Sequence, residues 1–106
     1  MYLKGFSDGI LLDRKTSINL EVGLVSLKKD MSNKLGNHAD EEEAYIILRG
    51  EAMLLLGDEK RKVKKGQVVY VPAGVPHQFY SLKHDFRYIY VATWPEKLKG
   101  RKNRFD

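Results

Sequence analysis

Three residues in two separate segments have side chains and spacing suited to binding a metal ion. His38 and Glu43 lie in the segment from Gly36 to Gly50, and His77 lies in the segment from Gly66 to Ser81. Each segment reads as a strand with such a residue at its entry. Two imidazoles and a carboxylate form a mixed nitrogen and oxygen set that suits Fe(II), Mn, Ni or Zn. The three residues therefore predict a site for a divalent transition metal.

The second segment resembles the second motif of the cupin superfamily, which runs G-x5-P-x-G-x2-H-x3-N. Gly66, Pro72, Gly74 and His77 stand at these positions without a gap, and Ser81 replaces the usual Asn. Matches at several fixed spacings make this half of the resemblance specific. The resemblance implies that His77 occupies a pocket position of a cupin barrel.

The first segment resembles the first cupin motif, G-x5-H-x-H-x3/4-E-x6-G, in its second half. Glu43 and Gly50 have the family spacing, and His38 precedes Glu43 at the distance of the family's second histidine. The first histidine position holds Gly36, and the opening glycine position holds Asp30. The resemblance therefore implies a site that keeps three of the four family ligands and loses one imidazole. Three protein ligands with open positions is also the arrangement of a catalytic metal.

A second register takes His38 as the first ligand and Asp40 as an extra ligand. It leaves only two residues before Glu43, where the family has three or four, so we rank it lower. Glu41 and Glu42 adjoin Glu43, but alternation along a strand sends Glu42 to the opposite face. Only Glu43 has the family spacing to a glycine.

Side chains two residues apart on a strand share a face, which extends the site beyond the ligands Glu43 and His77. Since the resemblance places these ligands inside the barrel near one mouth, we expect a mainly apolar and aromatic pocket. Its expected lining residues are Tyr45, Ile47, Phe79 and Ser81.

Strands separated by polar, glycine-rich or proline-containing turns make up the chain. Residues 18–27 begin with alternating apolar and polar side chains, the period of a half-buried strand. We expect the polar triplet Lys83-His84-Asp85 to form a hairpin tip. The expected strands are Ile18 to Leu27, Ala44 to Leu48, Ala52 to Leu56, Arg61 to Lys64, Gln67 to Val71, Pro76 to Tyr80 and Phe86 to Trp94.

Short strands without helical partners predict a sandwich or barrel, because a sheet with one apolar face must bury it against another. Cupins are jelly rolls, so the resemblance implies an all-β double-stranded β-helix, or jelly-roll barrel. We expect residues 1–95 to form one such domain and residues 96–106 to form a basic C-terminal tail.

Composition restricts the class of protein. The chain has 106 residues, the length of one domain, and it has no cysteine, which excludes disulfides and thiolate metal sites. Its longest apolar run, Ala52 to Leu56, is too short to cross a bilayer, and without a targeting segment we expect a cytoplasmic protein. Of the net charge of +5, residues 96–106 supply +3, so we expect a solvated tail and no nucleic-acid partner.

Family and fold do not decide the chemistry, since cupins include dioxygenases, decarboxylases, sugar isomerases and epimerases, and binding modules without catalysis. We expect a metal-dependent enzyme acting on a small, anionic or carbohydrate-like molecule, with Fe, Mn, Ni or Zn as cofactor. The alternative is a non-catalytic small-molecule-binding or sensor module with a degenerate metal site. The resemblance also implies a homodimer, the commonest symmetric oligomer.

Overall fold

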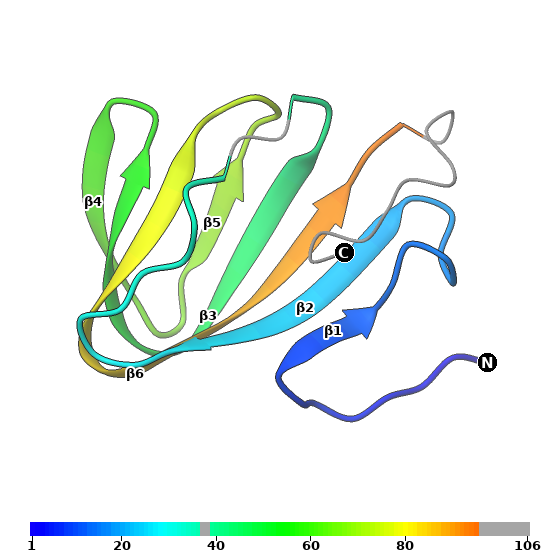
Figure 1. The fold of residues 1–106 in the computed structure, drawn as a ribbon, viewed down its shortest axis with the longest axis horizontal. Coiled ribbons are helices and arrows are strands. Elements are labelled where there is room, and N and C mark those ends of the chain that lie inside the picture. The colour runs from blue at the N-terminus through cyan, green and yellow to red at the C-terminus, as the bar shows by residue number, and fades with distance from the viewer. Residues whose placement is uncertain (37–38, 96–106) are drawn as a thin grey trace.

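Six antiparallel strands form the part of the chain that the structure describes (Figure 1). This computed structural model describes residues 1–36 and 39–95, the side chain of His84 excepted, so the predicted ligand His38 and the basic tail lie outside the described residues. The strands are β1 (Gly9–Leu12), β2 (Leu20–Leu27), β3 (Glu42–Leu56), β4 (Glu59–Lys64), β5 (Val68–Val71) and β6 (His77–Thr93).

The strand order is β1-β2-β6-β3-β4, and β5 pairs with the first half of β3. Figure 1 shows β3 and β6 running together through a bend, from the wall that holds β4 to the wall that holds β1 and β2. Within the described ranges no helix is long and apolar enough to span a membrane. The all-β jelly-roll prediction is confirmed.

The bend coincides with a break in the ladder between β3 and β6. The register between the two strands shifts from Ile47 to Ala52. Gly50 lies in this break with a φ of 82°, and a Cβ added there would lie 2.6 Å from the carbonyl oxygen of Asp85. Glycine is therefore required both for the backbone conformation and for the close approach of β6.

The predicted hairpin tip at Lys83-His84-Asp85 is wrong, because this triplet lies inside the continuous strand β6. In the same way, the two strands expected around Gly50 are the halves of β3. Both polar interruptions lie at the bend, where Lys83 and Asp85 are exposed. Exposed strand positions accept polar side chains without a turn, so the change in polarity marked a bend and not a chain reversal.

Aromatic rings fill the space between the two walls. Tyr45, Phe79, Phe86 and Tyr88 are buried, and the ring centroids of their contacting pairs lie 4.9 to 5.5 Å apart. Ile47 belongs to the same hydrophobic cluster. Three of the predicted pocket residues therefore pack in the core of the barrel, where tilted and edge-to-face ring contacts are favourable.

At the start of β2 the buried face is the reverse of what the apolar alternation suggests, although Leu24 further along is buried as expected. Ile18, just before β2, and Leu20 are exposed, whereas Glu21 has an exposed fraction of 0% and Gly23 is buried. Gly23 lies against the ring of Tyr90, since an added Cβ would lie only 2.1 Å from Cε2 of that ring. Glu21 and Gly23 thus face inward because the buried guanidinium of Arg14 bonds to the first and the ring of Tyr90 packs against the second.

Candidate metal centre

Two of the three predicted metal ligands meet inside the barrel. Glu43 is the second residue of β3, His77 is the first residue of β6, and their exposed fractions are 2% and 3%. Nε2 of His77 lies 3.5 Å from Oε1 of Glu43. The turn before His77 brings it there, with Val75 N–H donating to the carbonyl oxygen of Pro72 at 3.3 Å and Gly74 at a φ of 80°.

The orientation of the His77 ring is set by its own turn. Nδ1 lies 3.0 Å from the carbonyl oxygen of Val75. A carbonyl oxygen only accepts hydrogen bonds, so Nδ1 carries the proton that it donates, and Nε2 is the atom turned toward Glu43. Metal-binding histidines are held in the same way by a carbonyl behind the ring.

Tyr45 joins the two predicted ligands. Its hydroxyl donates a short hydrogen bond to Oε2 of Glu43 and lies 2.9 Å from Nε2 of His77. Tyr45 follows Glu43 by two residues on the same strand, so both side chains point inward. Edge contacts with the rings of Phe79 and Tyr88, at 5.0 and 5.4 Å, fix the position of the phenol.

Gly36 stands beside the centre, at the position where the cupin motif has its first histidine. It forms a two-sided backbone bridge with His77, with N···O distances of 2.9 and 3.0 Å. A Cβ at this position would lie 2.8 Å from Nε2 of His77. The motif alignment therefore agrees with the geometry, and the absence of a side chain at Gly36 lets the His77 ring lie directly against this backbone.

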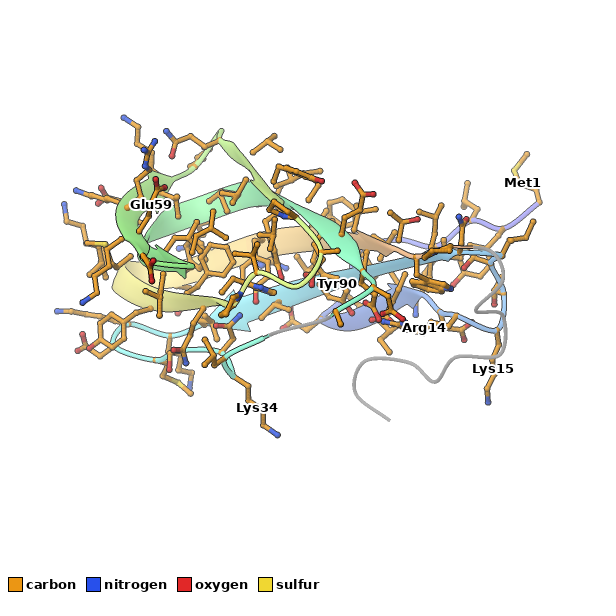
Figure 2. The ribbon with its side chains drawn as sticks, turned by 90° about the horizontal axis from the view of Figure 1, so that it is seen from above. Met1, Arg14, Lys15, Lys34, Glu59 and Tyr90 are labelled. Atoms are coloured by element: carbon orange, nitrogen blue, oxygen red, sulfur yellow. The ribbon has the colours of Figure 1, made fainter. Side chains whose placement is uncertain are left out.

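A second polar cluster, which the sequence interpretation missed, adjoins the centre. Arg14 donates from Nη1 and Nη2 to the two carboxylate oxygens of Glu41, at 3.0 Å each, and from Nε to Glu21. Tyr90 donates to Glu21 at 2.6 Å, and the guanidinium carbon lies 4.2 Å from the ring centroid of Trp94. Figure 2 shows Arg14 and Tyr90 near one another between the strands. We call these five residues the Arg14 cluster.

The Arg14 cluster has a local origin in the turn between β1 and β2. Oδ1 of Asp13 accepts hydrogen bonds from the backbone N–H groups of Lys15 and Thr16, at 3.0 and 2.8 Å. These bonds lower the pKa of Asp13, the bond from Thr16 contributing most. Burial alone would lower the pKa of Arg14, but its hydrogen bonds with Glu41 and Glu21 reverse this, and the pKa is raised.

The register of the sheet connects the cluster to the candidate metal centre. Ala92 of β6 pairs with Glu43 on one side and with Glu21 on the other. Adjacent strands lie about 4.8 Å apart, so the backbones of the two glutamates are separated by about 10 Å. Glu41 precedes Glu43 by two residues. The Arg14 cluster thus lies directly beside the candidate metal centre, and its guanidinium is already bonded to two carboxylates.

Two further predicted site residues, Asp40 and Ser81, differ in their exposure. Asp40 is exposed, and Ser81 is buried, with its backbone bridged to residues 30 and 31. Among residues 1–36 and 39–95, no group of three or more His, Cys, Asp or Glu side chains could hold a metal. A hollow of about 420 Å³ opens elsewhere, between β4 and β5, over Leu54, Val63 and Val69. Its lining does not include Glu43 or His77, the two predicted ligands that the structure describes.

Comparisons with known proteins agree with this architecture. A family model, the cupin domain, matches residues 23–91. The uncharacterized protein SCO3923 of Streptomyces coelicolor is 37% identical over 90 residues, which are 85% of this chain and 85% of that protein.

Two solved structures share the fold. TT1209 from Thermus thermophilus superposes with a TM-score of 0.74 at 20% identity, over 83% of this chain and 82% of that one. DMSP lyase DddQ from Ruegeria pomeroyi superposes with a TM-score of 0.65 at 28% identity, over 73% of this chain and 39% of that one. With its strands, its second motif and the matched family model in agreement, the chain belongs to the cupin family.

Proposed function

We propose that this cupin is a metal-dependent enzyme that acts on a small molecule. The observation that carries the proposal is the buried pair of Glu43 and His77, whose Oε1 and Nε2 atoms converge to 3.5 Å. Two ligands of one metal, each bound at about 2.0 to 2.2 Å, stand roughly 2.8 to 3.6 Å apart. The pair fits a divalent transition metal, and we assign His38 as a further ligand from its spacing to Glu43.

Each described residue has a defined part in this site. A bound divalent metal would supply Lewis-acid polarisation of a substrate oxygen. Glu43 contributes negative charge, and the carbonyl of Val75 holds the ring of His77 in a fixed orientation. The aromatic core beneath them keeps water from the inner side of the centre. Dioxygenase, isomerase or epimerase, and decarboxylase chemistry are all compatible with this arrangement.

The Arg14 cluster beside the site favours one class of substrate. Arg14 is the buried cation next to the centre, but it is bonded to both Glu41 and Glu21. A guanidinium neutralised in this way is a poor anchor for a substrate carboxylate. We therefore propose an uncharged, hydroxyl-bearing substrate over an anionic one.

A second candidate is a non-catalytic binding or sensor module with a degenerate metal site. The hydroxyl of Tyr45 favours it, because this group links Glu43 and His77 by hydrogen bonds within the protein. Gly36 at the first histidine position favours it too, since one family ligand is lost there.

Metal content distinguishes the two candidates. Protein dialysed without chelator is measured by elemental mass spectrometry, together with Glu43→Gln and His77→Ala. Glu42→Gln is the matched control, because Glu42 is the neighbouring carboxylate but is exposed on the other face of β3. The enzyme proposal expects a near-stoichiometric transition metal in the wild type and the control and its loss in both site variants. A wild type that cannot be loaded with Fe(II), Mn, Ni or Zn would move the proposal to the binding module.

We also propose a homodimer formed through the outer face of the wall that holds β2, β3, β5 and β6. Ile46 pairs with Val68 and with Ile89, and Tyr70 lies on the same face. Val68 and Tyr70 are exposed, with fractions of 67% and 58%. Other exposed or half-buried apolar residues of this face are Leu20, Val22, Ala44 and Val91, whereas Leu24, which pairs with Ile89, is buried.

The charges at the ends of this face suit a two-fold arrangement. Glu42 lies on it at one end and Arg87 at the other, so antiparallel packing of two copies brings opposite charges together.

Sedimentation should give a dimer for the wild type and a monomer for Ile46→Lys. Met31→Lys, at an exposed apolar residue outside the strands, should remain dimeric. A monomeric wild type at micromolar concentration would refute this interface.

A further inference from the structure

The hydroxyl of Tyr45 lies against both Glu43 and His77. Its oxygen is within hydrogen-bond distance of Oε2 of Glu43 and lies 2.9 Å from Nε2 of His77, and the Nε2 to Oε1 distance is 3.5 Å. We infer that Tyr45 is a protein ligand of the metal. This inference rests on the proposed function, because it concerns the metal of that same site.

The two distances to the His77 nitrogen match the spacing of ligands around a metal. Ligand atoms bound at about 2.0 to 2.2 Å stand roughly 2.8 to 3.1 Å apart at right angles and up to about 3.6 Å apart at tetrahedral angles. The two distances to Nε2 of His77 fall within these ranges. The contact between Tyr45 and Oε2 of Glu43 is a short hydrogen bond whose proton lies between the two oxygens. If that proton left to solvent and the phenol oxygen bonded to a metal, a small movement of the Glu43 carboxylate would lengthen this contact.

Packing holds the phenol in this position. Tyr45 has an exposed fraction of 1%, and its ring lies edge-on between Phe79 and Tyr88. The hydroxyl therefore has no room to turn toward solvent. The hydroxyl of the neighbouring Tyr88 instead accepts a hydrogen bond from Nδ2 of Asn33 at 3.1 Å.

The missing first histidine of the cupin motif leaves a ligand position that Tyr45 can fill. Gly36 replaces the first histidine of the motif, and among the described residues no third His, Cys, Asp or Glu joins the pair. The group that does join them is a phenol. Replacing an imidazole by a phenolate makes the ligand set richer in oxygen than the family's imidazole-rich set, which favours the harder first-row ions.

Iron(III) is a direct probe, because an iron(III)-phenolate bond absorbs visible light and an iron(III) centre with only imidazole and carboxylate ligands lacks that band. Metal-free protein is given one equivalent of iron(III) as its citrate complex and passed through a desalting column. Bound iron is then measured, and the visible and resonance Raman spectra are recorded. We expect a visible charge-transfer band with phenolate vibrations in the wild type.

The variants assign the band to one residue. Tyr45→Phe keeps the buried ring and should lose the band and bind Zn at least about tenfold more weakly, as expected for removing one ligand contact. Tyr88→Phe removes a neighbouring buried hydroxyl and should keep both properties. Circular dichroism and the melting temperature establish that each variant is folded.

The outcomes separate this inference from the function on which it rests. Iron that binds to the wild type without the band, or a band that persists in Tyr45→Phe, would refute the tyrosine ligand and leave the metal site in place. A wild type that takes up neither iron nor zinc would refute both proposals.

Discussion

Replacing Arg14 by methionine should destabilise this protein far more than removing an exposed charge. The guanidinium makes three hydrogen bonds to the carboxylates of Glu21 and Glu41, and all three residues are buried. Methionine retains much of the side-chain volume but leaves two buried carboxylates without their cation. Breaking a buried ion pair by removing one partner costs about 3 to 5 kcal/mol. For a domain of this size that is a fall in melting temperature of roughly 15 to 25 °C.

Urea unfolding followed by circular dichroism and by fluorescence measures this cost. Trp94, the single tryptophan, packs against the guanidinium and reports on the cluster. Arg61→Met is the matched control, since Arg61 is exposed and its nitrogen lies 4.0 Å from an oxygen of Glu59. An exposed pair contributes about 0 to 1 kcal/mol, so the control should unfold close to the wild type.

A triple variant separates charge from packing. Arg14→Met combined with Glu21→Gln and Glu41→Gln removes the carboxylate charges together with the cation, and it should recover a large part of the lost stability. If Arg14→Met unfolds within about 1 kcal/mol of the wild type, the buried ion pairs do not stabilise the fold as we argue. If the triple variant is no more stable than Arg14→Met, the cost lies in packing against Trp94 and not in uncompensated charge.

Two further predictions follow from single contacts. Gly23→Ala should destabilise the protein by about 1 to 3 kcal/mol in urea unfolding, because its Cβ would overlap the ring of Tyr90, whereas Gly5→Ala, with open space around it, should change little. Hydrogen bonds from Lys62 and Lys83 lower the pKa of Glu51 below its usual value of 4.5. Its contribution to stability is therefore present above pH 4.5 and is lost as the pH falls through the lowered value. Glu51→Gln should unfold at lower urea than the wild type at pH 7, and a difference that persists at pH 2 would contradict this.

The sequence predicted the fold well because the cupin motifs carry backbone requirements. Gly74 supplies the positive φ of the turn before His77, and Gly50 supplies the bend of β3. These glycines have fixed spacing from Glu43 and His77, so the motif predicts both the turn and the residue that it presents. The same motif spacing predicts that Glu43 and His77 meet, while the metal itself remains a prediction.

The Arg14 cluster could not be predicted, because its partners are distant in sequence and polar. Alternation in β2 suggests that Glu21 faces water, and only the cation from the preceding turn and the hydroxyl of Tyr90 reverse that expectation. One signal was present for Glu41, which precedes Glu43 by two residues and therefore shares its inward face. No comparable pattern marked Arg14, since the turn that carries it has no periodicity.

The shared bend of β3 and β6 also determines how the chain must fold. Each of these strands belongs to both walls, and between them the chain makes the excursion through β4 and β5. The wall that holds β1 and β2 takes strands from both sides of this excursion, so it cannot be assembled from a contiguous piece of chain. Closing such long loops before their contacts form places this domain among folds that form in milliseconds to seconds. Because Glu43 and His77 lie in different walls, a ligand at the candidate metal centre would stabilise the whole barrel against unfolding, not one half of it.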